Sequence, residues 1–345
     1  MTIKKERGTR RATIRDVARE AEVSISTVSR YLNGASNIST ETSQKIGKVI
    51  ERLRYTPNTA ARSLRGTSTK SVLLVIPDIT NPYYGQIARS VQWNLDRRGY
   101  AMMLFDSNSS LREEAAIEAA QHMGINGILL ASLNIRANII QKLLDTNVPV
   151  VLLNSYDNSP FDEVFGDIEQ CTYVITQNYI SLGHTRIAFA GGNPEYVHEM
   201  GRRNGYERAM READLEIDPR YVVELGFLQS DGYECGRILA ELSPLPSAVC
   251  CANDLIALGL MSALHEMGIA IPEQVSVAGV DNIPYGQISW PSLTSISNDA
   301  VAFARAGVRM LMERIEGKMV DSPRKVIIRR EFIMRDSVAP YKGEK

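Results

Sequence analysis

The 345-residue sequence predicts an α/β protein in which a small helical module precedes a larger core of two doubly wound parallel sheets. Two patterns carry this prediction. Apolar residues repeat with helical spacing up to about residue 64, and from Ser71 onward short apolar strands alternate with helical stretches. The second pattern is too long for one sheet, so we expect two lobes with a cleft between them.

Charge divides the chain at the same point. Residues 1–70 hold fifteen Lys and Arg against six Asp and Glu, a net charge of +9, although the whole chain carries only −1. A basic end on an acidic body is typical of a nucleic-acid-binding module.

Several function classes are disfavoured by composition. The basic residues 1–11 have no apolar segment behind them, so no secretory signal is expected, and no apolar run is long enough to span a bilayer. The cysteines lack metal-ligand spacing, which favours reduced thiols in the cytoplasm and no metal or cofactor. They are Cys171, Cys235, Cys250 and Cys251.

The helical module is predicted to begin with a helix-turn-helix. Thr13 and Asp16 form a capping-box pattern at the first helix, Ser24 caps a second helix after a short turn, and a third helix runs from near Ser39 to Leu53. We place this headpiece at residues 1–57, structured from about residue 12. A short helical segment and linker follow at residues 58–70.

The second helix has the chemistry of a DNA recognition helix. Ile25, Ser26 and Arg30 share one side, and Arg30 is suited to reading guanine through two parallel hydrogen bonds. The remaining hydroxyl side chains suit phosphate contacts: Ser24, Thr27 and Ser29. Each residue alone also fits an ordinary capped surface helix. The basic charge and the row of hydroxyls together favour DNA binding.

Motifs along nearly the whole chain point to one family. In the headpiece they are TIRDVAREAEVS (residues 13–24) and TVSRYLN (27–33), followed by YTPN (55–58) and ARSL (61–64). In the core they are PDITNPYY (77–84), GHTRIA (183–188) and GVDN (279–282). The sequence closely resembles the LacI/GalR family of bacterial transcription regulators.

The resemblance implies further contacts with DNA. Seven residues, Asn58–Leu64, are too few for a stable isolated helix, since about 12–15 are needed in water. The resemblance implies that two such hinge helices pair in the minor groove, where Leu64 wedges into the central base step. An ordinary linker with a stray leucine is the alternative. Backbone contacts are implied for Thr13, Asn33, Tyr55, Asn58 and Ala61.

A two-lobed core like that of periplasmic binding proteins is also implied. We expect one lobe at residues 71–168 plus 298–326 and the other at 169–297 plus 327–340. Ligands bind beyond the carboxyl ends of parallel strands, where several candidate residues fall. The candidates for effector binding are Tyr83, Tyr84, Asn154, Arg202, Asn253 and Asp281. Aromatic faces with an Asp and an Arg suit a polyol.

Leu228 departs from the family pattern. It stands where the family often has an aromatic residue that stacks on the ligand, while the neighbouring Phe227 is expected to point the other way. Leu228 stays among the effector-binding candidates, but it offers no flat ring on which a ligand could stack, so the usual stacking is not a guide to the ligand class.

The function expected is a repressor of a sugar or carbohydrate catabolic operon, controlled by a small-molecule effector such as a sugar, a related polyol or a nucleoside. It would bind a pseudo-palindromic operator in the bacterial nucleoid as a homodimer, since no heptad tail for a tetramer follows residue 340. The alternative is a stand-alone sugar-binding protein of periplasmic type. An enzyme is not expected, because no nucleophile motif or paired carboxylates appear.

Overall fold

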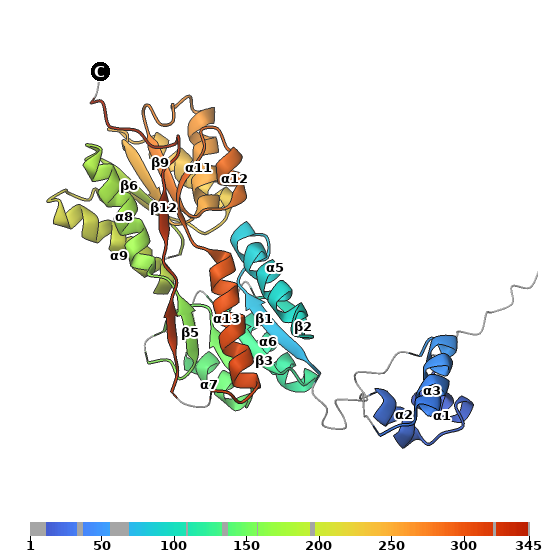
Figure 1. The fold of residues 1–345 in the computed structure, drawn as a ribbon. Coiled ribbons are helices and arrows are strands. Elements are labelled where there is room, and N and C mark those ends of the chain that lie inside the picture. Colours follow the sequence, from blue (N-terminus) through green and yellow to red (C-terminus); the bar gives the residue numbers. More distant parts are fainter. Residues whose placement is uncertain are drawn as a thin grey trace, which may run out of the picture. The chain divides into compact units, whose positions relative to one another are not determined.

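The computed structural model describes residues 12–32, 37–55, 69–107, 110–132, 137–156, 158–193, 197–319 and 322–343. It divides into two compact units, Met1–Thr69 and Lys70–Lys345. We call the first unit the headpiece and the second the core (Figure 1). No helix in the described part of the chain is long and apolar enough to cross a membrane.

The described residues of the headpiece form helices α1 (Ile14–Glu20), α2 (Ile25–Leu32) and α3 (Thr40–Leu53). Helix α1 begins with the predicted capping box, in which Thr13 and Asp16 satisfy each other's backbone N–H groups. The three helices enclose a small core that includes Val17, Val28 and Ile46. One apolar stripe on each helix therefore accounts for the packing of this unit.

Gly47 lies in the middle of α3, where glycine costs about 1 kcal/mol relative to alanine. A Cβ at this position would lie only 2.9 Å from the hydroxyl oxygen of Tyr31. The absence of a side chain at Gly47 thus leaves room for the Tyr31 side chain of α2 against α3. This close packing of α2 on α3 is the physical reason for the glycine.

The first core sheet has the strand order β11-β5-β4-β3-β1-β2, and all its pairings are parallel. We call it lobe 1. Its strands are β1 (Ser71–Ile76), β2 (Ala101–Asp106), β3 (Gly127–Leu130), β4 (Val150–Leu152), β5 (Asp162–Phe165) and β11 (Lys325–Ile327). Its helices are α5 (Pro82–Asp96), α6 (Ser110–Met123), α7 (Ala137–Asp145) and α13 (Ala300–Ile315).

The second core sheet, lobe 2, has the order β12-β10-β9-β8-β6-β7, with only the edge strand β12 antiparallel to its neighbour. Its strands are β6 (Ile187–Gly191), β7 (Val222–Glu224), β8 (Ala248–Cys251), β9 (Ser276–Asp281), β10 (Thr294–Ser297) and β12 (Glu331–Ile333). Its helices are α8 (Ile168–Ser181), α9 (Val197–Glu212), α10 (Gln229–Ala240), α11 (Asp254–Glu266) and α12 (Pro284–Ile288), with a 3₁₀ turn at Pro219–Tyr221.

Alternation along β1 shows why helices cover both faces of the lobe 1 sheet. Val72, Leu74 and Ile76 pack in the core beneath α5 and α13, whereas Leu73 and Val75 pack in the core beneath α6 and α7. A strand buried on both faces reads as a continuous apolar run, as β1 does. The predicted doubly wound α/β fold is confirmed.

Within the described residues, the chain passes between the two sheets three times (Figure 1). The crossings lie between β5 and α8, between β10 and α13, and between β11 and β12. We call them the first, second and third crossing. Because they are the covalent links between the lobes, side chains on them are placed to respond to movement of one lobe against the other.

Candidate functional site

Helix α2 exposes the side that was predicted to read bases. Ser26 and Arg30 are exposed and Ile25 is 38% exposed, while Val28 on the opposite side is fully buried in the headpiece core. The buried residue fixes which side of this amphipathic helix turns outward, and the predicted side chains lie on that outward side.

Some basic residues of the headpiece are ion-paired, but Arg30 has no carboxylate partner among the described residues. Arg19 pairs with Asp16 at 2.8 Å, and Lys45 pairs with Glu22 at 2.6 Å. The guanidinium of Arg30 is therefore available to accept an external partner, and its five N–H donors match the acceptors of guanine or phosphate.

The hydroxyl groups at the start of α2 form one cluster. Ser24 Oγ accepts a hydrogen bond from the backbone N–H of Thr27 at 3.1 Å and lies 2.6 Å from Ser26 Oγ and 2.8 Å from Thr27 Oγ1. Ser24 therefore caps the helix as predicted. Ser29 is half-buried one turn further along.

Two of the predicted backbone contacts have structural roles of their own. Thr13 Oγ1 donates to Asp16 Oδ2 at 2.7 Å, and Tyr55 is only 9% exposed in the headpiece core. Both side chains thus hold the headpiece together, whatever they contact on DNA. The remaining predicted DNA contacts lie outside the described residues: Asn33, Asn58, Ala61 and Leu64.

In the core, Tyr83 and Tyr84 stand at the start of α5, directly beyond the carboxyl end of β1. Asn81 caps this helix by accepting the N–H of Tyr83 at 2.9 Å, and Pro82 occupies the first helical position. Tyr83 is buried and Tyr84 half-buried, with ring centroids 5.2 Å apart in an edge-to-face arrangement. Burial raises the pKa of both phenols, so both remain protonated donors.

Asp281 ends β9 in lobe 2, and its backbone is strained. It has φ of +111°, and the next residue, Asn282, has φ of +52°. Asn298, on the second crossing, donates to Asp281 Oδ1 at 2.9 Å. Burial raises the pKa of Asp281, while the charge of Arg202 and the bond from Asn298 oppose that rise.

The buried Asp254 holds this strained turn in shape, a role the sequence did not reveal. Its Oδ2 accepts the backbone N–H of Ile283 at 2.8 Å, and its Oδ1 accepts the hydroxyl of Ser295 at 2.7 Å. Gly279 leaves the room required, because a Cβ there would lie 2.3 Å from Asp254 Oδ1. Burial and the nearby Asp281 raise the pKa of Asp254, which favours its protonated form.

Arg202 lies on α9, which approaches α8 very closely. A Cβ at Gly205 would lie 2.0 Å from the carbonyl oxygen of Glu169, so glycine is required there. Thr172 on α8 donates its hydroxyl to the carbonyl of Arg202. Arg202 is thereby fixed where the middle of α9 packs against the start of α8.

These four side chains lie within electrostatic reach of one another, although they come from both lobes. Asp281 raises and Arg202 lowers the pKa of Tyr83 and Tyr84, and burial is the largest cause of the rise in both phenols. The structure therefore brings together Tyr83, Tyr84, Arg202 and Asp281, which we call the interlobe cluster. It combines aromatic surface, hydroxyl donors, a carboxylate and a guanidinium.

The other effector-binding candidates have different surroundings. Asn154 donates to the carbonyl of Ser132, and Asn253 caps α11 while donating to the carbonyl of Phe227 at 3.0 Å. Leu228 is 48% exposed at the start of α10. Within the described residues, no hydrogen bond or ion pair joins these three to the interlobe cluster.

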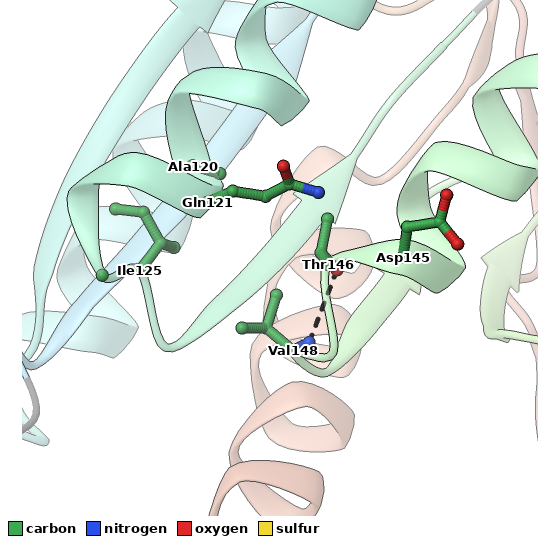
Figure 2. Close-up of a pocket in the computed structure, with 7 residues that line it drawn as sticks. Ala120, Gln121, Ile125, Asp145, Thr146 and Val148 are labelled. Carbon is green, nitrogen blue, oxygen red and sulfur yellow. Dashed lines mark hydrogen bonds between the residues drawn. The ribbon is translucent and has the colours of Figure 1, made fainter.

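Lobe 1 also contains a pocket of about 250 Å³ between the ends of α6 and α7 (Figure 2). It is lined by Ala120, Gln121, Gly124, Ile125, Asp145, Thr146 and Val148. Ile125 precedes β3 and Val148 precedes β4, so the pocket lies at the amino ends of these strands. It is therefore at the opposite edge of the sheet from the interlobe cluster.

Comparison with known proteins agrees with both units. A family model described as bacterial regulatory proteins of the lacI family matches residues 13–58. A model of the periplasmic binding protein-like domain matches residues 176–338. The helix-turn-helix match argues against the stand-alone binding protein that we considered as an alternative.

The relatives extend over nearly the whole chain. The HTH-type transcriptional repressor PurR of Haemophilus influenzae (strain PittEE) is 32% identical over 331 residues, which cover 95% of this chain and 98% of the relative. The structure of a transcriptional regulator CelR–cellobiose complex is 28% identical, covers 95% of this chain and 100% of its own, and has a TM-score of 0.72.

A crystal structure of the lac repressor dimer bound to operator and an anti-inducer shares the fold, with a TM-score of 0.84 at 23% identity over 96% of this chain and 100% of its own. The relatives are regulators rather than enzymes, as expected from the sequence. The chain belongs to the LacI family of bacterial transcriptional regulators and is a DNA-binding repressor of that family.

Proposed function

We propose that this protein binds a pseudo-palindromic operator as a homodimer and is controlled by a small molecule bound at the interlobe cluster. The proposed DNA binding rests on the exposed side of α2, which carries Ile25, Ser26 and Arg30. Arg30 has no carboxylate partner among the described residues. A helix with these side chains fits the major groove, with Arg30 on a guanine and the hydroxyl cluster at the phosphates.

The hinge segment Asn58–Leu64 extends this proposal to the minor groove. Its two copies in a dimer fold together on DNA, and Leu64 inserts at the central base step. Its length supports this reading, because so short a helix needs a partner to be stable. DNA affinity then depends on how far apart the two cores hold the hinges.

Dimerisation is supported by exposed apolar side chains on both lobes. In lobe 1, Trp93 on α5 and Leu104 on the edge strand β2 are 66% and 39% exposed. In lobe 2, Ile288 and Trp290 are 81% and 96% exposed. Apolar surface of this kind, including an uncovered sheet edge, favours burial against a second copy of the chain.

The effector in this proposal is a sugar or a related polyol or nucleoside, and the regulated genes serve carbohydrate catabolism. Asp281 and Arg202 would bind neighbouring hydroxyl groups, while Tyr83 and Tyr84 supply aromatic surface. The structure of CelR was solved with cellobiose, which supports a carbohydrate. The protein would act in the bacterial cytoplasm, on the nucleoid when bound to DNA.

Control would follow from the crossings between the lobes. Asp281 is hydrogen-bonded to Asn298 on the second crossing, so a ligand held by Asp281 acts directly on a link between the lobes. Closure of the lobes would change the dimer interface and hence the spacing of the hinges, which couples effector and operator binding.

The direct test is operator selection with the purified full-length protein, repeated with a panel of sugars and nucleosides. One member of the panel is expected to change operator affinity at least about fivefold, and the sign shows whether it induces or co-represses. Deletion of residues 1–66 should abolish DNA binding while preserving effector binding. DNA binding by the truncated protein would refute the assignment to α2 and the hinge.

A further inference from the structure

Arg330 lies on the third crossing, and its charge reaches the interlobe cluster. Burial raises the pKa of both Asp281 and Tyr83, and the positive charge of Arg330 opposes that rise in each. Arg330 therefore lies within electrostatic reach of the proposed effector site, on a part of the chain that neither the motifs nor the strand ends identified.

Two neighbouring groups fix the guanidinium of Arg330. Its Nη1 donates to Sγ of Cys171 in the first turn of α8. The guanidinium also lies over Gly166 on the first crossing, where a Cβ would be only 2.3 Å from Arg330 Nε. Gly166 thus makes room for Arg330, and the first and third crossings meet at this side chain.

Arg330 has no ion-pair partner among the described residues around it. No carboxylate forms an ion pair with it there, whereas Arg314 and Arg324 in the same core both pair with Asp162 at 2.7 Å. Burial raises the pKa of the Cys171 thiol, so this contact supplies no negative charge at neutral pH. The Nε–H of Arg330 is buried and has no hydrogen-bond partner.

The nearby carboxylates are already engaged. Asp281 faces Arg202 as well as Arg330, and burial keeps Asp254 toward its protonated form. Asp78, whose charge contributes to the raised pKa of Tyr84 after burial and Asp281, accepts hydrogen bonds from Thr80. A half-buried cation left without a counter-charge is costly, and an anionic ligand would remove that cost.

We propose that the effector carries an acidic group, a carboxylate or a phosphate, which Arg330 binds while Arg202 and Asp281 bind its hydroxyl groups. The planar fork of arginine donors suits either anion. Arg330 is on the third crossing and contacts Cys171 on α8 and Gly166 on the first crossing. Binding of the acid therefore also stabilises one arrangement of the lobes. This inference rests on the proposed function and narrows its ligand class.

The test uses full-length protein and matched pairs of compounds: ribose with ribose 5-phosphate, glucose with glucose 6-phosphate, and glucose with gluconate and glucuronate. Inorganic phosphate is included at matched ionic strength. Calorimetry gives Kd and gel shift gives operator affinity. At least one anion is expected to bind at least about tenfold more tightly than its neutral parent. The pairs separate phosphate from carboxylate recognition.

Variants then assign the effect to one side chain. Arg330→Gln should weaken binding of that anion about 10- to 100-fold, and Arg330→Lys should restore part of the loss because it restores the charge. Arg329→Gln, at the exposed neighbouring residue, should bind as the unmodified protein does. Urea unfolding checks that each variant remains folded.

Three outcomes overturn the inference: no anion binds better than its neutral parent, Arg330→Gln keeps the full affinity, or Arg329→Gln loses as much. If a neutral sugar binds and changes operator affinity, the proposed function stands and only the role of Arg330 fails. If no compound changes operator affinity, effector control itself fails.

Discussion

At the scale of single residues, the two proposed sites contain a charged group without an ion-pair partner and a charged group on a strained backbone. Arg30 lacks a carboxylate partner among the described residues of the headpiece, and Asp281 ends a buried strand with a positive φ. A strained backbone persists only where surrounding contacts hold it, which Asp254 and Asn298 do for Asp281.

Arg30→Ala should relax base preference at one position in each half-site. Loss of a bidentate contact with guanine removes about 1–3 kcal/mol of discrimination, or about 5- to 150-fold in relative affinity. Gel-shift titration against the operator and its single-base variants measures this. Arg52→Ala, at a residue paired with Glu20, serves as the control and should leave base preference unchanged. Equal weakening on every sequence would make Arg30 a phosphate contact instead.

Asp281→Ala should abolish the effector response while leaving basal operator binding within about twofold, because the side chain is proposed to bind ligand and lies outside the headpiece. Operator affinity with and without effector is the measurement. Glu273→Ala, at an exposed residue in the same lobe, should retain the response. A normal response in Asp281→Ala would remove this residue from the site.

At the scale of elements, buried ionic contacts hold the short strand β11 in its sheet. Asp162 at the start of β5 has a fully buried carboxylate between Arg314, at the end of α13, and Arg324, just before β11. Burial tends to raise the pKa of Asp162, but hydrogen bonds from the two arginines outweigh it and lower the pKa overall.

Asp162→Asn should therefore destabilise the core by about 3–5 kcal/mol, since half-buried Arg314 loses its counter-charge and Arg324 keeps only its ion pair with Glu313. Urea unfolding at pH 7 measures the loss, and Asp96→Asn at an exposed helix end is the control.

The same pair of variants should differ in acid. A carboxylate with a lowered pKa contributes its full stability above its unfolded pKa of about 3.9 and loses it as the pH falls through the folded value. Unfolding free energy between about pH 5 and pH 2 should therefore fall less steeply in Asp162→Asn than in the unmodified protein. Parallel curves would show that Asp162 is not the titrating group.

At the scale of the whole molecule, the proposed control requires two copies of the chain, because one hinge segment cannot pair alone. The exposed apolar residues on β2, on α5 and after α12 supply surface for that association. Edge strands left uncovered in this way associate readily with a second edge.

Leu104→Glu should weaken the dimer by at least about 2 kcal/mol, roughly thirtyfold in the dissociation constant, because it buries an unpaired charge at the proposed interface. Analytical ultracentrifugation measures the monomer–dimer equilibrium, and operator affinity should fall with it. Ile327→Glu changes an exposed residue at the other edge of the same sheet and serves as control. Dissociation by Ile327→Glu alone would place the interface at that edge instead.

The sequence by itself determined the family, the α/β fold and the outward side of α2. These follow from local patterns: helix caps, apolar periodicity and continuous apolar runs such as β1. The short strands β5, β10, β11 and β12 each contain charged or hydroxyl residues (DEVF, TSIS, KVI and EFI), so the sequence shows no continuous apolar run for them.

Only the tertiary structure decided which distant residues meet. Gly47 under Tyr31, Asp254 beneath the turn after β9, and Arg330 over Gly166 are pairings between separate elements. Their energies depend on burial and on the charges nearby, which no local pattern records. The sequence therefore predicted a DNA-binding regulator with a ligand-binding core. The packing of the two lobes showed which charged residues lie together at the proposed ligand site.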